Sequence, residues 1–172
     1  IDVAITNGGG LRRSSIGEGE IRIRDIFELL PFENALVTME LTGEQLTNLL
    51  GVITASREAQ SGARVVYFTK PDKTVEIVSV RLRDANQTEI EIDPKKTYRI
   101  VTIDYLVNRG GDRFSILQQG KNVKPLGLTV RDAIIEYVKA ETAAGRGLRP
   151  NLDGRFAYDR TKAAGTEEVK PQ

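Results

Sequence analysis

Two glycine-rich segments hold the residues of this sequence that are best suited to contacting a ligand. The first, AITNGGGLRR, spans residues 4–13 and places Asn7 before three consecutive glycines and Arg12 after them. The second, NRGGDRF, carries Gly111 and Asp112. Glycines allow a backbone to approach a ligand closely, an arginine fork matches phosphate or ribose oxygens, and a carboxylate accepts hydrogen bonds from paired ribose hydroxyls. Judged from its residue types alone, the first segment fits a ligand-binding loop and a structural turn equally well.

Neither segment matches a standard phosphate-binding loop. The Walker loop requires G-x-x-x-x-G-K-[ST], and the dinucleotide loop requires G-x-G-x-x-G at the start of a helix. The residues that follow the first segment, SSIGEGEIR, have the composition of a loop instead. The polar residues also have ordinary alternatives, because most arginines are solvated and an Asp in a turn commonly hydrogen-bonds its own backbone.

Two aromatic residues lie near the glycine-rich segments. Phe32 follows Pro31 in LPFENA, with Asn34 two residues later, and Tyr105 precedes the second segment at the end of a predicted strand. An isolated aromatic is usually part of the core, and an isolated Asn is usually a turn residue. Aromatic residues make up only 6% of the chain, so two of them beside the glycine-rich segments favour stacking on a nucleobase.

The composition excludes several classes of function. The chain has 172 residues, 40% of them hydrophobic, which is enough for one domain with a packed core. It has no His and no Cys, the residues that supply most zinc ligands and many catalytic groups. The formal net charge of +1 argues against a nucleic-acid partner, and no apolar run is long enough to span a membrane. We therefore expect no catalytic residue and no metal ligand here.

Two helices are predicted from their capping residues and their periodicity. Thr42 and Gln45 form a capping-box pattern ahead of a helix over residues 43–56. Thr129 and Asp132 have the same relation ahead of the segment VRDAIIEYVKAETAAG. The apolar face of the first helix consists of Leu46, Leu49, Leu50 and Ile53, and that of the second consists of Val130, Ala133, Ile134, Tyr137 and Val138.

Strand patterns occur between and around these helices. The segment EIRIRDIFELL starts with strand-like alternation and ends as a short helix before Pro31. At the other end of the chain, the composition from Thr161 onward predicts a linker or disordered tail. Because strands and helices are mixed without a regular βαβ rhythm, we predict an α+β fold with mixed β-sheets packed with helices. The predicted strands are residues 2–6, 35–41, 63–68, 75–83, 88–92, 97–106 and 155–159, with a β-hairpin turn at KPDKT.

Four segments taken together resemble a known family. In order along the chain they are AITNGGGLRR, IFELLPFENALVTMELTGEQL, SGARVVYF and KTYRIVTIDYLVNRGGDRF. This series resembles the C-terminal domain of the 5′-nucleotidase family, which includes periplasmic UDP-sugar hydrolases, cell-wall nucleotidases and the animal ecto-5′-nucleotidase. The resemblance implies a nucleotide-binding domain over residues 1–160 and leaves residues 161–172 as the linker or tail.

The resemblance also implies a set of substrate-binding residues. Phe32 matches one of two aromatics that sandwich the base, and Tyr105 lies seven residues before Asp112 where the family pattern has six. Arg113 replaces the glycine usual after GGD. We therefore expect Phe32→Ala to weaken nucleotide binding more than Tyr105→Ala. The implied substrate-binding set is Asn7 and Arg12 as polar contacts, Gly9 and Gly10, Phe32, Asn34 at the base edge, Tyr105, Gly111, and Asp112 as acceptor for the ribose hydroxyls.

A division of labour follows from the resemblance. In such enzymes a divalent metal pair is held by an N-terminal metallophosphoesterase domain, and the C-terminal domain binds the nucleoside. The expected partners of this chain are therefore a nucleotide or nucleoside and that N-terminal domain, with no cofactor in this chain and an extracellular, periplasmic or cell-wall location. The alternative is a non-catalytic binding or dimerisation module of a multidomain cell-surface protein. The shifted Tyr105 and the linker-like tail favour a binding module, and a dimerisation module would follow the animal enzyme of the family, which dimerises through this region.

Overall fold

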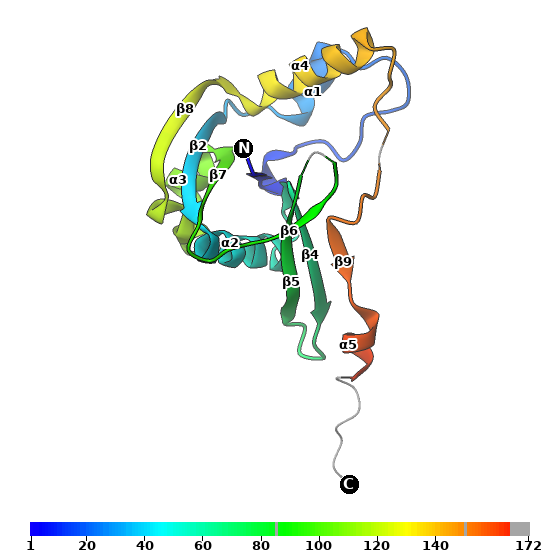
Figure 1. Cartoon of the computed structure of the whole chain (residues 1–172). Coiled ribbons are helices and arrows are strands. Elements are labelled where there is room, and N and C mark those ends of the chain that lie inside the picture. Colours follow the sequence, from blue (N-terminus) through cyan, green and yellow to red (C-terminus); the bar gives the residue numbers. More distant parts are fainter. Residues whose placement is uncertain (85, 150, 166–172) are drawn as a thin grey trace.

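Two mixed β-sheets and the helices around them make up the fold (Figure 1). The structure, a computed structural model, describes residues 1–84, 86–149 and 151–165. The strands in these ranges are β1 (Val3–Thr6), β2 (Ala35–Thr42), β3 (Ala59–Ser61), β4 (Ala63–Thr69), β5 (Val75–Arg83), β6 (Glu89–Glu91), β7 (Thr97–Ile103), β8 (Lys121–Thr129) and β9 (Phe156–Tyr158). One sheet has the order β3-β1-β7-β2-β8 and the other has the order β6-β5-β4-β9.

Each sheet contains one parallel pair among antiparallel pairs. β1 is parallel to β7, and β4 is parallel to β9. β4 and β5 form the predicted hairpin. The helices described are α1 (Ile23–Leu29), α2 (Gly43–Ala55), α3 (Asp104–Arg109), α4 (Val130–Ala143) and α5 (Arg160–Gly165), together with the 3₁₀ helices η1 (Gly8–Gly10) and η2 (Asp112–Gln119). This mixture confirms the predicted α+β class.

Helix α2 lies at the centre of the core, as its sequence predicts. The Thr42 side chain accepts a hydrogen bond from the Gln45 N–H, and the Gln45 side chain accepts one from the Thr42 N–H. The predicted apolar face is completely buried, and the same core cluster includes Ile100 of β7 and Val65 of β4. Burying a Leu or Ile side chain contributes about 1.5–3 kcal/mol, so α2 joins the two sheets into one core.

Helix α4 begins as predicted but buries less than its apolar face implies. Thr129 and Asp132 form the capping box, and hydrogen bonds from the Thr129 side chain and backbone lower the pKa of Asp132. Among its described residues, α4 fully buries only Arg131, and Tyr137 is exposed. Four of the five residues of the predicted apolar face are half-buried, and α4 packs along the short helix α1 and against β8 (Figure 1).

The predicted strand over residues 97–106 ends early. β7 stops at Ile103 and α3 starts at Asp104, whose Oδ1 accepts a hydrogen bond from the Tyr105 N–H at 2.8 Å. A carboxylate in the first turn stabilises a helix start, which explains the change from strand to helix. Tyr105 therefore lies on a helix, and its predicted position at a strand end is corrected.

Two other segments differ from expectation. The alternation just before Ile23 does not form a strand. Strand β8 is not expected from the sequence, because it contains Pro125 and Gly127 and is exposed along nearly its whole length. It lies at the edge of its sheet, where a residue without an N–H group is tolerated.

The segment predicted as a linker starts inside a short helix. Helix α5 begins at Arg160, where the Asp159 carboxylate accepts hydrogen bonds from the backbone N–H groups of Thr161 and Lys162. The rest of the predicted tail, residues 166–172, lies outside the described residues.

Candidate functional site

Three segments that are distant in sequence meet at one edge of the five-stranded sheet. Because β1 and β7 are parallel, both end at the same edge. β2 is antiparallel to β7, with Leu36 opposite Ile103, so β2 begins where β7 ends. The first glycine-rich segment, which follows β1, therefore comes close to the residues that precede β2 and to Tyr105, which follows β7.

These segments form a cavity of about 330 Å³. Pockets that bind small molecules commonly have volumes of about 300–1,000 Å³. Two aromatic rings, two amide side chains and a guanidinium line it, a combination that suits a flat ring system with polar edges. The structure thus brings together seven of the nine predicted binding residues: Asn7, Gly9, Gly10, Arg12, Phe32, Asn34 and Tyr105.

The three glycines of the first segment leave space beside the cavity, and their backbone conformation does not itself require glycine. They form η1, and none of the three has a positive φ. A Cβ atom at Gly9 would lie 3.3 Å from Nδ2 of Asn7, and one at Gly10 would lie 3.6 Å from its Oδ1. Larger residues would therefore crowd the Asn7 side chain and fill part of the cavity.

Phe32 and Tyr105 face the same cavity from different elements. Their side chains are similarly accessible, with 42% and 44% of their surfaces exposed. The Arg12 guanidinium lies 5.0 Å from the centroid of the Phe32 ring, within the range of a cation–π contact. The position of Tyr105 on α3 brings it to the cavity despite the additional residue before Asp112.

Asn7, one of the residues that line this cavity, has an unsatisfied polar atom. Its Oδ1 is buried and accepts no hydrogen bond from the described residues. A buried acceptor without a partner costs about 1–3 kcal/mol, so such atoms are uncommon in folded proteins. Because this atom has almost no accessible surface, a ligand in the cavity reaches it only after the Asn7 side chain turns toward the ligand.

Gly111 and Asp112 do not belong to the cavity lining. Gly111 has a φ of 69°, a left-handed conformation that favours glycine. Asp112 starts η2 and is exposed. Within the described part of the chain, its carboxylate takes part in no hydrogen bond or ion pair. The second glycine-rich segment therefore leaves its acidic group available.

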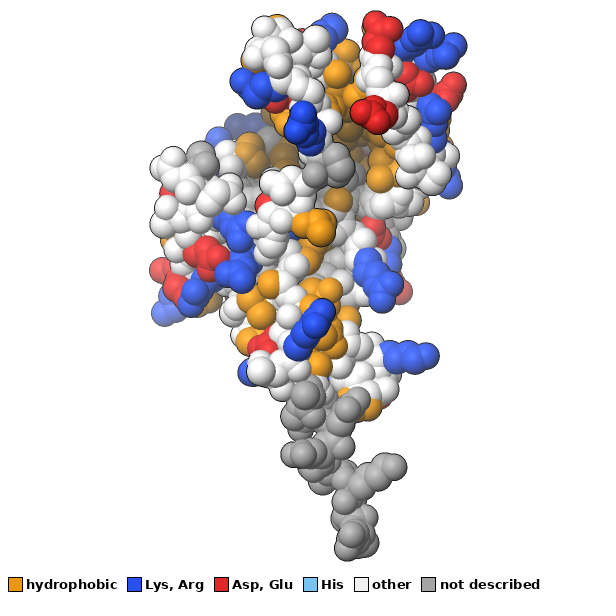
Figure 2. Space-filling model, turned by 90° about the vertical axis from the view of Figure 1, so that its right-hand side faces the viewer, with side chains coloured by type: hydrophobic (Ala, Val, Ile, Leu, Met, Phe, Trp, Pro, Cys, Tyr) orange, Lys and Arg blue, Asp and Glu red, His pale blue; other side chains and the backbone are white. Residues whose placement is uncertain are grey.

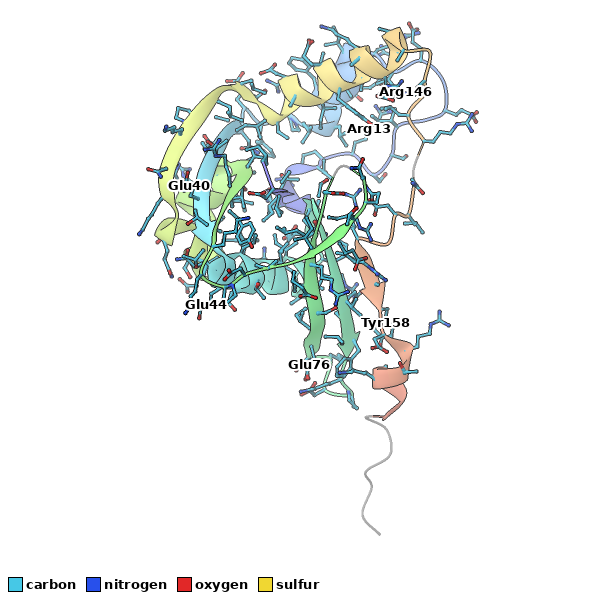
Figure 3. The ribbon with its side chains drawn as sticks, in the orientation of Figure 1. Arg13, Glu40, Glu44, Glu76, Arg146 and Tyr158 are labelled. Carbon is cyan, nitrogen blue, oxygen red and sulfur yellow. The ribbon has the colours of Figure 1, made fainter. Side chains whose placement is uncertain are left out.

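The first segment is anchored along helix α1. The Arg12 N–H donates to the carbonyl of Leu29 at 2.9 Å, and the Arg13 guanidinium donates to Asp25 at 3.1 Å (Figure 3). A hydrogen bond from the Arg22 backbone, together with the Arg13 contact, holds the pKa of Asp25 below its ordinary value. Arg12 is thereby held next to the end of α1, which leads into Phe32.

Asp104 is a supporting residue that the sequence reasoning missed. Its Oδ1 accepts hydrogen bonds from the N–H of Ala35, at 3.1 Å, and of Tyr105, at 2.8 Å. One carboxylate therefore fixes the start of β2 relative to the start of α3. No local pattern could reveal this contact, because Ala35 and Asp104 are 69 positions apart.

Arg131 of α4 is a second missed supporting residue. Its buried guanidinium donates to the carbonyl of Leu30 at 3.1 Å and lies 4.0 Å from the centroid of the Phe27 ring. It also forms an ion pair with Glu33 at 3.5 Å. Leu30 and Glu33 flank Phe32, so α4 holds the segment that presents this ring.

The described residues offer no binding site for metal ions. Across residues 1–84, 86–149 and 151–165, no group of three or more His, Cys, Asp or Glu side chains is arranged to hold one. The divalent metal pair implied by the family resemblance is expected in the N-terminal domain and not in this chain. The side chains that line the cavity, two amides, a guanidinium and two aromatic rings, are groups suited to binding.

Surface features add two observations. Basic and acidic side chains are interspersed on the face shown in Figure 2, as expected for a chain with a net charge of +1. None of the helices in the described ranges is both long enough and apolar enough to cross a lipid bilayer.

Comparison with known proteins establishes the family. Residues 1–119 match the family described as 5′-nucleotidase, C-terminal domain. This match covers more than half of the 172 residues, so the chain belongs to the 5′-nucleotidase C-terminal domain family.

Individual relatives agree with this assignment. The chain is 29% identical over 161 residues to a trifunctional nucleotide phosphoesterase of Bacillus subtilis, covering 90% of this chain and 11% of that protein. It is 31% identical over 153 residues to an apyrase of Tabanus yao, covering 81% of this chain and 27% of that protein.

Solved structures show the same relation. The crystal structure of a 5′-nucleotidase precursor from Thermus thermophilus matches with a TM-score of 0.76 at 28% identity, covering 92% of this chain and 32% of that chain. This chain therefore spans no more than 32% of the length of any of the three proteins, and it matches C-terminal parts of longer members of the family.

Proposed function

We propose that this chain is the substrate-binding domain of a 5′-nucleotidase or UDP-sugar hydrolase-like phosphoesterase and binds the nucleoside part of a nucleotide. The observation that carries the proposal is the cavity in which seven predicted binding residues, from three separate segments, come together. The printed functions of the relatives, a nucleotide phosphoesterase, an apyrase and a 5′-nucleotidase, support a nucleotide as the ligand.

In this proposal the aromatic and amide residues of the cavity recognise the base. Phe32 and Tyr105 stack on its faces, and each such contact contributes about 1–3 kcal/mol without strong preference among bases. Asn34 contacts the base edge. Asn7 and Arg12 supply polar contacts. Once the Asn7 side chain turns toward the ligand, its buried Oδ1 accepts a hydrogen bond and so gains the partner that it lacks in the chain.

The second glycine-rich segment recognises the sugar. Gly111 allows the turn, and the Asp112 carboxylate accepts hydrogen bonds from the ribose hydroxyls. A deoxyribose would leave that carboxylate without one of its partners, and sites that lose a polar partner in this way discriminate strongly. The domain therefore prefers ribonucleosides to deoxyribonucleosides.

Hydrolysis of the phosphate ester is assigned to a separate domain. Divalent metals held by an N-terminal metallophosphoesterase domain of the same polypeptide supply Lewis-acid chemistry, and this chain contributes binding and orientation. The same proposal places the whole protein outside the cytoplasm, in an extracellular, periplasmic or cell-wall location.

Calorimetry tests the binding function directly. The 172-residue chain is titrated with adenosine, AMP and UDP-glucose, and at least one of them is expected to bind with measurable heat at millimolar concentration. The same preparation, supplied with Mg²⁺, Mn²⁺ or Zn²⁺, is expected to release no phosphate from AMP. Absence of heat with all three ligands would contradict the binding role, and EDTA-sensitive phosphate release by a pure sample would contradict the division of labour.

A further inference from the structure

Glu58 connects the two glycine-rich segments. It lies just after α2, and its side chain is only 10% exposed. Oε2 accepts a hydrogen bond from the Gly8 N–H at 2.6 Å, and Oε1 accepts one from the Arg113 guanidinium at 3.1 Å. The two partners are 50 and 55 positions away from Glu58 in the sequence.

Both contacts reach residues that adjoin the predicted binding groups. Gly8 lies between Asn7 and Gly9, which line the cavity. Arg113 directly follows Asp112. A displacement of either segment therefore changes the distance between the Asp112 carboxylate and the cavity.

The two hydrogen bonds that Glu58 accepts are of a strong type. A carboxylate that accepts from a guanidinium and a backbone N–H forms two charge-assisted hydrogen bonds, which are stronger than neutral ones. Glu58 is shielded from water, whereas the Arg113 side chain is 54% exposed, so screening weakens the Arg113 contact more than the contact to the Gly8 N–H. On its other side, the Arg113 guanidinium lies 4.8 Å from the centroid of the ring of Phe114, a buried core residue.

We propose that Glu58 and Arg113 are positioning residues that together form a loop clamp, which fixes the second glycine-rich segment against the first and so orients Asp112 toward the ribose. The inference rests on the proposed nucleoside-binding function. Glycine, the residue that the family resemblance implies at position 113, has no side chain with which to reach Glu58. The loop clamp is therefore a feature of this chain that the family pattern does not contain.

The need for such a clamp follows from the segment it restrains. Two consecutive glycines precede Asp112, and Gly111 adopts a left-handed conformation. Glycine loses more conformational freedom on ordering than any other residue, so an unrestrained segment would sample many positions of Asp112. Misplacing a ligand-contacting group by about 1 Å weakens its contribution severely.

A set of variants distinguishes the effect of losing the loop clamp from the effect of a general loss of stability. Glu58→Ala removes both contacts, Arg113→Gly removes one, and the double variant completes a cycle. Glu141→Ala is the matched control, because Glu141 on α4 accepts two hydrogen bonds from Arg146. Arg146 lies at the opposite end of the molecule from the β4–β5 hairpin (Figure 3).

Calorimetry with adenosine and 2′-deoxyadenosine provides the first readout. Glu58→Ala and Arg113→Gly are each expected to weaken adenosine binding about five- to tenfold and 2′-deoxyadenosine binding less, so that the preference for ribose falls. The losses in the double variant are expected to be less than additive. The control variant is expected to keep both affinities. A general loss of folding would lower the two affinities equally and leave their ratio unchanged.

Hydrogen exchange provides a readout that does not require a ligand. Arg113→Gly is expected to speed exchange of the Gly8 amide, in the other segment, by about fivefold or more, because Glu58 is then held less firmly. Unchanged exchange at Gly8, or an unchanged preference for ribose in a chain that binds adenosine, would overturn the clamp. If the unaltered chain binds no nucleoside, the proposed function fails, and the exchange experiment still decides whether the clamp exists.

Discussion

Two cavities of similar size differ in the side chains that line them. The cavity of about 330 Å³ lies where the first glycine-rich segment meets Phe32 and Tyr105. The other, of about 360 Å³, lies between the start of the chain and the ends of β5 and β9, and it is lined by several charged residues. The second cavity is slightly larger, although the predicted binding residues line the first. Cavity volume therefore does not identify the binding site.

The charged groups of the larger cavity are largely paired with one another, with the exception of Nε of Arg83, which is buried without a partner among the described residues. Asp153 accepts hydrogen bonds from Nε and Nη2 of Arg155, and its backbone carbonyl accepts one from Arg83 at 2.7 Å. The Asp2 carboxylate accepts from the backbone N–H of Arg99. Groups that are satisfied inside the fold gain little from a ligand.

The smaller cavity is lined by fewer charged groups and by accessible aromatic rings. The buried Oδ1 of Asn7 has no partner among the described residues, and Phe32 and Tyr105 are each more than 40% exposed. An unsatisfied buried atom alone does not distinguish the two cavities, because Nε of Arg83, which lines the larger one, also lacks a partner. The accessible apolar rings beside polar groups favour the smaller cavity as the binding site, and three predictions test this.

The largest expected effect is the loss of an aromatic face. Phe32→Ala and Tyr105→Ala are each expected to weaken nucleoside binding by about 2 kcal/mol, because each ring stacks on the base. Their similar exposure favours similar losses, and the sequence-based expectation that Phe32 matters more than Tyr105 stays a prediction that this experiment decides. Calorimetry with adenosine measures both losses, and a loss for Phe32 alone would support the original expectation.

Tyr158→Ala is a matched control for this comparison. Tyr158 is 46% exposed, close to the value for Tyr105, and lies on β9 far from the cavity (Figure 3). Its ring packs edge-on against Tyr67, with 5.5 Å between the centroids. The variant is expected to lose some stability and to retain nucleoside affinity. Weakened binding in this variant would mean that exposed aromatics act through general stability.

Removal of the unsatisfied acceptor of Asn7 has the second largest expected effect. Asn7→Ala is expected to weaken nucleoside binding by about 1.5 kcal/mol, because the ligand then loses a hydrogen bond to Oδ1. The melting temperature is expected to stay nearly the same, since that atom makes no hydrogen bond within the described residues. A large drop in melting temperature with unchanged affinity would assign Asn7 to the fold instead of the ligand.

Local patterns predicted those parts of the molecule that local interactions determine. The capping boxes at Thr42 and Thr129 depend on residues three positions away and are present as predicted. The order of motifs indicated seven residues that line one cavity. Their convergence follows from strand pairing between β1, β2 and β7, which residue periodicity alone could not reveal.

Contacts between distant residues could not be predicted in this way. Asp104 and Glu58 act on backbone groups 69 and 50 positions away, and neither belongs to a local motif. The run VTIDYL has strand-like composition, yet Asp104 in its middle starts a helix. Edge strand β8 was missed because Pro125 is typical of a loop unless the edge position is known.

The smallest expected effect concerns an acid in the larger cavity and its dependence on pH. The hydrogen bond from the Arg155 side chain lowers the pKa of Asp153 from 3.8 to about 2. The pKa of this carboxyl is lower in the folded state than in the unfolded state, so its stabilising contribution is complete above about pH 4. That contribution is lost as the pH falls through about 2. Asp153→Asn is expected to lower the free energy of unfolding by about 1 kcal/mol at pH 7, after allowance for screening by solvent.

Denaturant unfolding at several pH values, combined with calorimetry, checks this last expectation. The stability difference between the Asp153→Asn variant and the unaltered chain should narrow between pH 4 and pH 2, with adenosine affinity at pH 7 unchanged.

Asp112→Asn provides the converse case, because the Asp112 carboxylate has no partner in the described part of the chain. It should weaken adenosine binding and leave stability unchanged. If both variants lowered stability, or if both weakened adenosine binding, the Asp153 and Asp112 carboxylates would not have the separate roles that their hydrogen bonding indicates.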